Sequence, residues 1–132
     1  MMTDVTILVC SAVLTFLMLG TASAFRTQAL APGGMVRATG NRDNLPEPTP
    51  MAARADRAAR NMVENLVLFT ALIVALNFAG KSTSSLAQIG ANIFFWARVA
   101  YWPIYVAGWS LRSLVWTVSI VGLGMIAWAA LT

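Results

Sequence analysis

The sequence predicts an all-α integral membrane protein built from four helices. Of its 132 residues, 58% are hydrophobic and only 11% are charged, which is too apolar for an ordinary soluble domain. Apolar runs alternate with short polar segments, and each run is close to the ~20 residues that a helix needs to cross a bilayer. A chain of this length forms one domain, residues 1–132, and four spans would use most of it.

The first span is expected at about residues 5–25, between Asp4 and Arg26. A cleavable signal peptide is the alternative, because the small residues of the segment 21–24 resemble a cleavage site. The start of the chain carries no basic residue, however, and the apolar run is longer than a signal-peptide core. We therefore expect a retained transmembrane helix.

A linker is expected at residues 26–52, where Gly, Pro and polar residues show no apolar periodicity. The second span is expected at 51–80. Its uncharged part, 65–80, is too short to cross a bilayer at 1.5 Å per residue. The charged turn 60–64 must therefore lie within the depth of the membrane, where charges are costly and usually serve a partner or a ligand.

The third and fourth spans are expected at 86–108 and 111–131. The short polar turn 81–85 makes the second and third spans an antiparallel hairpin. Each of the last two spans carries one arginine, Arg98 and Arg112 respectively.

Basic residues orient the predicted protein. Lys81 is the only basic residue expected on the side opposite the first loop. By the positive-inside rule the first loop is cytoplasmic, and both termini lie outside. Six arginines flank or lie in this loop: Arg26, Arg37, Arg42, Arg54, Arg57 and Arg60.

Polar side chains form two stripes that this topology brings into one leaflet. On the second span, positions 54, 57, 60, 61 and 64 fall within one third of the helix circumference. On the third span, Arg98, Tyr101 and Tyr105 are spaced i, i+3, i+7 and therefore lie on a single helix face. Guanidinium groups suit carboxylates and phosphates, so the set predicts a site for a small zwitterionic or polyanionic ligand. Its members are Arg57, Arg60, Asn61, Glu64, Arg98, Tyr101, Tyr105 and Arg112.

Several kinds of site are excluded or disfavoured. The chain has no histidine and a single cysteine, Cys10, so neither a metal site nor an internal disulfide is expected. No serine-based triad and no glycine-rich phosphate loop is present. The net charge of +4 fits membrane topology better than nucleic-acid binding. An internal salt-bridge network that holds the helices together in lipid remains an alternative to a ligand site.

The polar motifs resemble those of the family of membrane-associated proteins in eicosanoid and glutathione metabolism (MAPEG). The matching segments are Arg57-x-x-x-Asn61-x-x-Glu64, Arg98-x-x-Tyr101-x-x-x-Tyr105 and Arg112-Ser113, and their phrasing is closest to the bacterial branch. The resemblance implies a homotrimer of four-helix subunits in a bacterial inner membrane. It also implies that glutathione, as co-substrate, binds between subunits in the cytoplasmic leaflet.

The resemblance also assigns roles by position. Arg112 would stabilise the glutathione thiolate, and Ser113 is a second catalytic candidate. Arg98 would contact a carboxylate of the ligand or brace Glu64. Two residues depart from the family pattern. Trp116 stands where some members have a tyrosine, and Asn65 stands where an aromatic or apolar residue is often found. The glutathione-binding candidates are Arg57, Arg60, Asn61, Glu64, Arg98, Tyr101, Tyr105 and, more loosely, Arg26.

Three functions are consistent with these residues. The first is a glutathione-dependent membrane transferase or peroxidase that acts on lipophilic electrophiles. The second is a binding or scaffold protein that keeps the pocket without catalysis, because a fold does not fix an activity. The third is a small anion transporter, although few polar residues continue toward the outer leaflet.

Overall fold

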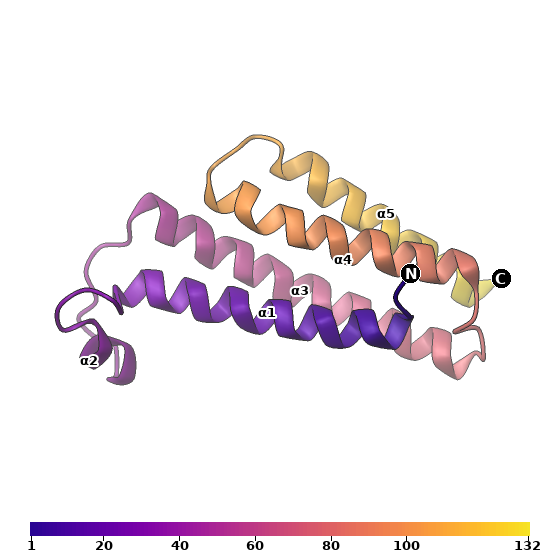
Figure 1. The fold of residues 1–132 in the computed structure, drawn as a ribbon, viewed down its shortest axis with the longest axis horizontal. Coiled ribbons are helices and arrows are strands. Elements are labelled where there is room, and N and C mark those ends of the chain that lie inside the picture. The colour runs from indigo at the N-terminus through magenta and orange to yellow at the C-terminus, as the bar shows by residue number, and fades with distance from the viewer.

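The computed structural model describes all of residues 1–132 and contains five helices and no strand. Four helices are long: α1 (Asp4–Thr27), α3 (Pro50–Phe78), α4 (Ser85–Val106) and α5 (Arg112–Leu131). The short helix α2 (Gly34–Thr39) lies in the first connection. Figure 1 shows the long helices running side by side, with α2 beyond one end of them.

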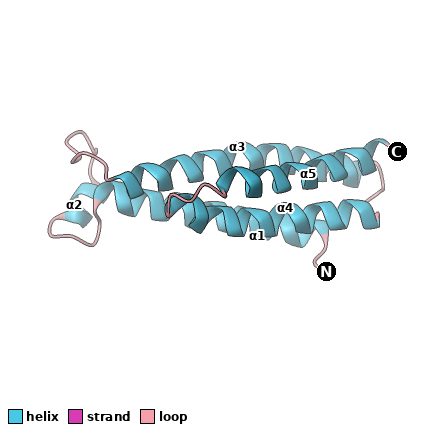
Figure 2. Ribbon diagram, turned by 90° about the horizontal axis from the view of Figure 1, so that it is seen from above, coloured by secondary structure: helices cyan, strands magenta, loops and turns pink.

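The long helices pack as two close pairs, α1 with α3 and α4 with α5. Helix α3 also contacts α4 and α5, and α1 contacts α4 but not α5. The first connection and the α4–α5 turn lie at one end, and the α3–α4 turn and both termini lie at the other (Figures 1 and 2). The polar stripes of α3 and α4 and the start of α5 therefore share one end, as the sequence predicted.

Polar residues start three of the long helices. The side chains of Thr3, Thr49 and Ser84 accept hydrogen bonds from backbone N–H groups in the first turns of α1, α3 and α4. These N–H groups have no partner within their own helix, so the caps define where each helix begins. Pro50 follows one cap directly, a position that proline tolerates because its missing N–H is not needed there.

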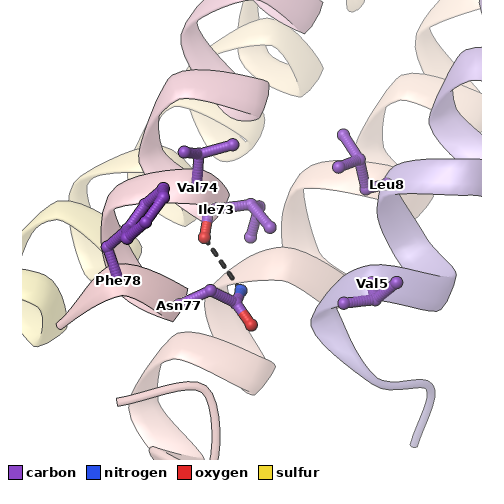
Figure 3. Close-up of a pocket in the computed structure, with 6 residues that line it drawn as sticks. All are labelled: Val5, Leu8, Ile73, Val74, Asn77 and Phe78. Carbon is purple, nitrogen blue, oxygen red and sulfur yellow. Dashed lines mark hydrogen bonds between the residues drawn. The ribbon is translucent and has the colours of Figure 1, made fainter. Parts of the chain in front are cut away.

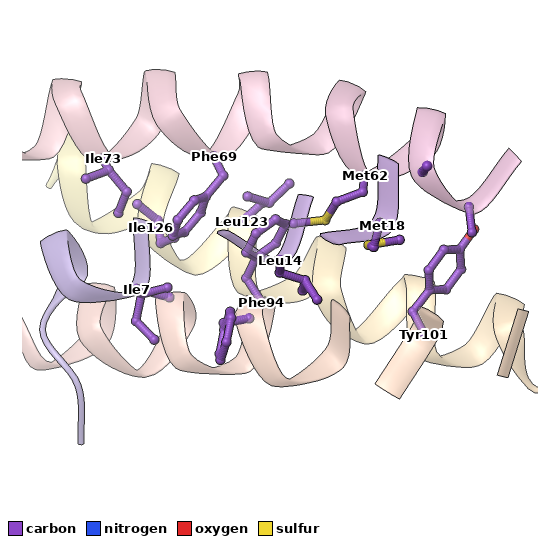
Figure 4. Packing of buried hydrophobic residues seen from close by; sticks show 14 of the residues in the cluster. Ile7, Leu14, Met18, Met62, Phe69, Ile73, Phe94, Tyr101, Leu123 and Ile126 are labelled. Atoms are coloured by element: carbon purple, nitrogen blue, oxygen red, sulfur yellow. The ribbon is translucent and has the colours of Figure 1, made fainter. Parts of the chain in front are cut away.

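Apolar side chains from all four long helices fill the centre (Figure 4). Phe69 of α3 stacks on Phe94 of α4, with ring centroids 4.4 Å apart. Helices α4 and α5 meet at Gly90 and Gly122, where a Cβ atom on Gly122 would lie 2.5 Å from the Gly90 carbonyl oxygen. Glycine is needed at this crossing because no larger residue leaves room for the facing backbone.

Three helices, α1, α3 and α5, are long and apolar enough to cross a membrane. Helix α4 has 22 residues, but Gln88, Asn92 and Arg98 interrupt it, and no stretch of it is as apolar as the best stretches of the other three. The chain is thus an all-helical membrane protein with three clear span candidates. Crossing by α4, the predicted third span at 86–108, stays a prediction.

The first connection is more ordered than the sequence predicted. It contains α2, and Arg37 of this helix folds back onto the end of α1. The Arg37 guanidinium donates to the carbonyl oxygens of Thr27, Gln28 and Pro32 at 2.9, 3.3 and 3.4 Å. The contact with Thr27 satisfies a carbonyl group that the helix end leaves without a partner, and the other two fasten α2 to the turn that follows α1.

Candidate functional site

A polar cavity lies between α3, α4 and α5, at the end that carries the first connection. Its volume is about 370 Å³. Four of the predicted site residues, from three helices, share its wall with two residues of α5. The lining residues are Asn61, Tyr101, Arg112, Ser113, Trp116 and Thr117.

Arg98 lies directly behind this wall and is completely buried, with 0% of its surface exposed. Its Nη2 group donates to the Oδ1 and the backbone oxygen of Asn61, at 2.8 and 3.3 Å. Its Nε and Nη1 groups have no hydrogen-bond partner. The guanidinium carbon lies 4.8 Å from the centre of the Tyr101 ring, which gives a cation–π contact.

No carboxylate pairs with Arg98. The resemblance implied a carboxylate ligand or Glu64 as its partner, and in the single chain an asparagine amide takes that place. A desolvated charge with unused N–H groups is costly. The wall of the cavity therefore carries positive charge that the chain itself leaves without a counter-ion.

Tyr105 joins two further arginines to the site. Its hydroxyl oxygen accepts a hydrogen bond from Nε of Arg57, at 3.1 Å. The guanidinium carbon of Arg112 lies 4.9 Å from the centre of the same ring. Tyr101 packs edge-on against Tyr105, with ring centroids 5.4 Å apart. The two tyrosines thus hold arginines of α3, α4 and α5 in one cluster.

Three predicted site residues lie outside this cluster. Arg60 is exposed and forms an ion pair with Asp56 at 2.9 Å, and Glu64 is exposed on α3 without an ion pair. Arg26 donates from Nη1 to the carbonyl oxygen of Pro46 in the first connection. An internal salt-bridge network is absent, because the Arg60–Asp56 pair is the only one in the structure and lies within one helix.

Some residues near the site escaped prediction. Asn65 is buried and donates from Nδ2 to the backbone oxygen of Asn61 at 2.8 Å. Thr117 lines the cavity, and its spacing from Ser113 on α5 would have placed it on the same face. Arg54 donates from Nε to the Val106 carbonyl oxygen at the end of α4, a structural contact at 2.8 Å.

A second cavity of about 360 Å³ lies at the opposite end of the molecule, between α1 and α3 (Figure 3). Five of its six lining residues are hydrophobic, and the sixth is Asn77. No charged side chain lines it. It lacks the donors that a polar ligand requires, so the cavity beside Arg98 is the candidate site.

A family model described as "MAPEG family" matches residues 5–132, nearly the whole chain. The chain belongs to the MAPEG family. The resemblance that its motifs suggested is confirmed, and the protein is a membrane protein of the eicosanoid and glutathione metabolism class. Comparison with curated proteins and with solved structures gives no match.

The MAPEG-like motifs gather arginines and tyrosines at one end of the apolar helices. Two of the three residues of the α3 motif, Arg57 and Asn61, contact Tyr105 and Arg98 of the α4 motif. The third, Glu64, is exposed and does not line the cavity of its own chain. The α3 and α4 motifs therefore meet in the candidate site, and Glu64 forms no ion pair within the single chain.

Proposed function

We propose that this MAPEG protein is a glutathione-dependent membrane transferase or peroxidase that acts on lipophilic electrophiles. The observation that carries the proposal is the cavity of about 370 Å³ that Asn61, Tyr101, Arg112 and Ser113 line together. Membership of the family supports glutathione as the co-substrate. Apolar helices around the site would deliver a lipophilic substrate from the bilayer.

The residues present suit glutathione, an anionic tripeptide with two carboxylates, an ammonium group and a thiol. Arg57 and Arg112 meet at the Tyr105 ring, and Arg98 adds a buried charge behind the wall. The cluster contains three guanidinium groups and no carboxylate, so a bound anion would supply the missing negative charge. Glu64 and Arg60 would join from the exposed face of α3.

The proposed assembly is a homotrimer of four-helix subunits in a bacterial inner membrane. The first connection would face the cytoplasm, and both termini would lie outside, because the arginines gather at the first connection. Glu64 and Arg60 lie on an exposed helix face that lipid would solvate poorly. A neighbouring copy that covers this face would complete the site.

Arg112 is the proposed stabiliser of the thiolate. A guanidinium near a thiol favours its ionised form, which is the reactive nucleophile. In a transfer, the thiolate sulfur forms a bond to the electrophilic carbon and the leaving group departs with its electron pair. In peroxidase action, two glutathione molecules reduce one hydroperoxide to an alcohol and water and become one disulfide. Ser113 lies beside Arg112 and would donate a hydrogen bond to the sulfur.

One observation supports a binding protein without catalysis as the second candidate. Trp116 lines the cavity where some relatives carry a tyrosine, so the tyrosine hydroxyl that lies near the thiol in those relatives is missing here. In that case the Arg112→Ala variant would keep binding glutathione. A small anion transporter, the third candidate, gains no support, because the cavity at the far end is apolar.

Turnover by the Arg112→Ala variant separates these functions. Purified protein in detergent is given glutathione with a chloronitroaromatic electrophile or with a lipid hydroperoxide. The enzyme proposal predicts turnover by the wild type, its loss in Arg112→Ala by about tenfold or more, and no change in Arg42→Ala. Arg42 is a suitable control because it is exposed and bonds only to the nearby Ala38 carbonyl.

Absence of turnover in the wild type with both substrates, while glutathione binds, would contradict the enzyme proposal and leave the binding protein. Equal turnover by the wild type and Arg112→Ala would remove Arg112 from the mechanism.

A further inference from the structure

Two neighbours determine how the Asn61 amide is turned. Its Oδ1 atom lies 2.8 Å from Nη2 of Arg98. A guanidinium only donates hydrogen bonds, so the atom that faces it must be the carbonyl oxygen of the amide and not the NH₂ group. Asn65 approaches from the next turn, with its Nδ2 atom 3.4 Å from the same oxygen and 2.8 Å from the Asn61 backbone oxygen.

The NH₂ group of Asn61 is consequently left for the cavity. Asn61 lines this cavity, and its Nδ2 atom makes no hydrogen bond within the chain. The buried atoms without a partner belong to Ser11 and Arg98, so Nδ2 of Asn61 is accessible. A ligand in the cavity thus meets two N–H donors at this point and no acceptor from Asn61.

We propose that Asn65 is a positioning residue for the ligand, acting together with Arg98 to fix the Asn61 amide. The ligand group at this wall is then a hydrogen-bond acceptor, a carboxylate or an amide carbonyl, and not an ammonium group. This inference rests on the proposed glutathione function. It states that a carboxylate or an amide carbonyl of the tripeptide binds at Asn61.

A second asparagine of α3 offers a comparison that separates the local bond of Asn65 from its contact with Asn61. Asn77 makes the same bond to the carbonyl four residues earlier, from Nδ2 to Ile73 at 2.9 Å. Its other contact is Asp4 of α1 at 2.8 Å, at the far end of the molecule. The two residues share the local bond and differ in the contact with Asn61. Asn77→Leu is therefore a matched control for Asn65→Leu.

Calorimetry with glutathione as the probe tests the positioning role. Loss of the Asn65 amide frees Asn61 to rotate, so Asn65→Leu should bind glutathione about three- to tenfold more weakly. Asn77→Leu should bind as the wild type does. Wild-type affinity in Asn65→Leu, or an equal loss in both variants, would overturn the proposal. Asn65→Ala replaces the leucine variant if the latter does not fold.

Asn61→Asp tests the kind of ligand group. The carboxylate has the size of the amide and still accepts from Arg98, but it turns an acceptor toward the cavity. If the ligand presents a carboxylate or a carbonyl there, binding falls by roughly tenfold or more. Unchanged or tighter binding would show that an ammonium group occupies this wall and would overturn the assignment.

The orientation of Asn61 has a test that needs no ligand. Protein labelled with ¹⁵N on asparagine shows the side-chain NH₂ signals, and Asn61→Asp identifies the Asn61 pair by its loss. The proposal predicts that the chemical shifts of this pair of signals change in Asn65→Leu and do not change in Asn77→Leu. An unmoved pair in Asn65→Leu would overturn it. Failure of the wild type to bind glutathione would contradict the proposed function alone, since these signals still report the orientation.

Discussion

Tyr105 contacts two arginines from different helices in two different ways. Its hydroxyl oxygen accepts from Arg57 of α3, and its ring lies under the guanidinium of Arg112 of α5. The hydroxyl holds a glutathione-binding candidate, whereas the ring holds the proposed thiolate stabiliser. Substitutions that remove one contact at a time therefore separate binding from chemistry.

Tyr105→Phe should weaken glutathione binding by about three- to tenfold, because Arg57 loses a hydrogen bond that orients it. Turnover at saturating glutathione should change little, because the phenyl ring still supports Arg112. Tyr105→Leu should reduce both. Calorimetry and steady-state kinetics measure the two effects, and a fall in turnover in Tyr105→Phe equal to that in Tyr105→Leu would contradict these roles.

At the scale of the residue, the sequence predicted part of the cluster but not the contacts within it. Helical spacing placed Arg57, Asn61, Tyr101 and Tyr105 on facing stripes, and the structure brings them together. Glu64, one of the expected partners of Arg98, is exposed and does not contact it in the single chain. Pattern arguments count charges on a face, whereas the partner of a buried group depends on side-chain directions across two helices.

Helices α4 and α5 owe their close packing to two glycines. A Cβ atom on Gly122 would lie 2.5 Å from the Gly90 oxygen and 2.8 Å from the Phe94 nitrogen, both backbone atoms. Backbone atoms cannot rotate out of the way as side chains do. The start of α5 carries Arg112 and Ser113, so this crossing also fixes the position of the proposed catalytic residues.

Gly122→Ala should lower the free energy of unfolding by about 1–3 kcal/mol, because the helices must separate to admit the methyl group. Gly124→Ala, two residues further along α5, is the control, since nothing lies within 4 Å of its added Cβ. It should be neutral or raise the stability by up to ~1 kcal/mol through helix propensity. Thermal unfolding in detergent compares the two, and equal melting temperatures would contradict the crossing.

The first connection, residues 28–49, depends on the hydrogen bonds that Arg37 donates to the end of α1. Arg37→Ala removes the donors to the carbonyl groups at the end of α1, so the connection should open more often. Cleavage within residues 28–49 by a protease of broad specificity, followed by the masses of the fragments, should become several-fold faster. Arg42→Ala, which loses only a contact to Ala38, should be cleaved at the wild-type rate. Equal rates for Arg37→Ala and the wild type would show that this cap does not hold the connection.

The long helices were predictable because polar turns and caps delimit apolar runs. The second span, expected at 51–80, is α3 at Pro50–Phe78, and the fourth, expected at 111–131, is α5 at Arg112–Leu131. The short helix α2 was missed. It has six residues, it follows a glycine in the left-handed conformation, and a long-range contact from Arg37 accompanies it. None of these features gives a periodic pattern.

The whole molecule leaves polar groups on an apolar surface. Arg57, Arg60 and Glu64 are exposed on α3, and Glu64 has no ion-pair partner in its own chain. Within a bilayer such groups require a polar partner. Helix packing in lipid leaves no stoichiometry in the sequence, so the proposed homotrimer derives from the family alone.

Native mass spectrometry in detergent should find an assembly of three 14.2 kDa chains. Because the neighbouring copy would cover Glu64, Glu64→Ala should weaken glutathione binding by about tenfold although Glu64 lies outside the cavity of its own chain. A monomer that binds glutathione as tightly with Glu64→Ala as without it would contradict a shared site.

The most direct test of the account is glutathione binding by the purified protein, measured by calorimetry beside Arg57→Ala and Arg42→Ala. The account predicts saturable binding in the wild type, binding weakened by about tenfold or more in Arg57→Ala, and no change in Arg42→Ala. No binding by the wild type at millimolar glutathione would contradict the glutathione site, and the cluster around Arg98 would then serve a different anion.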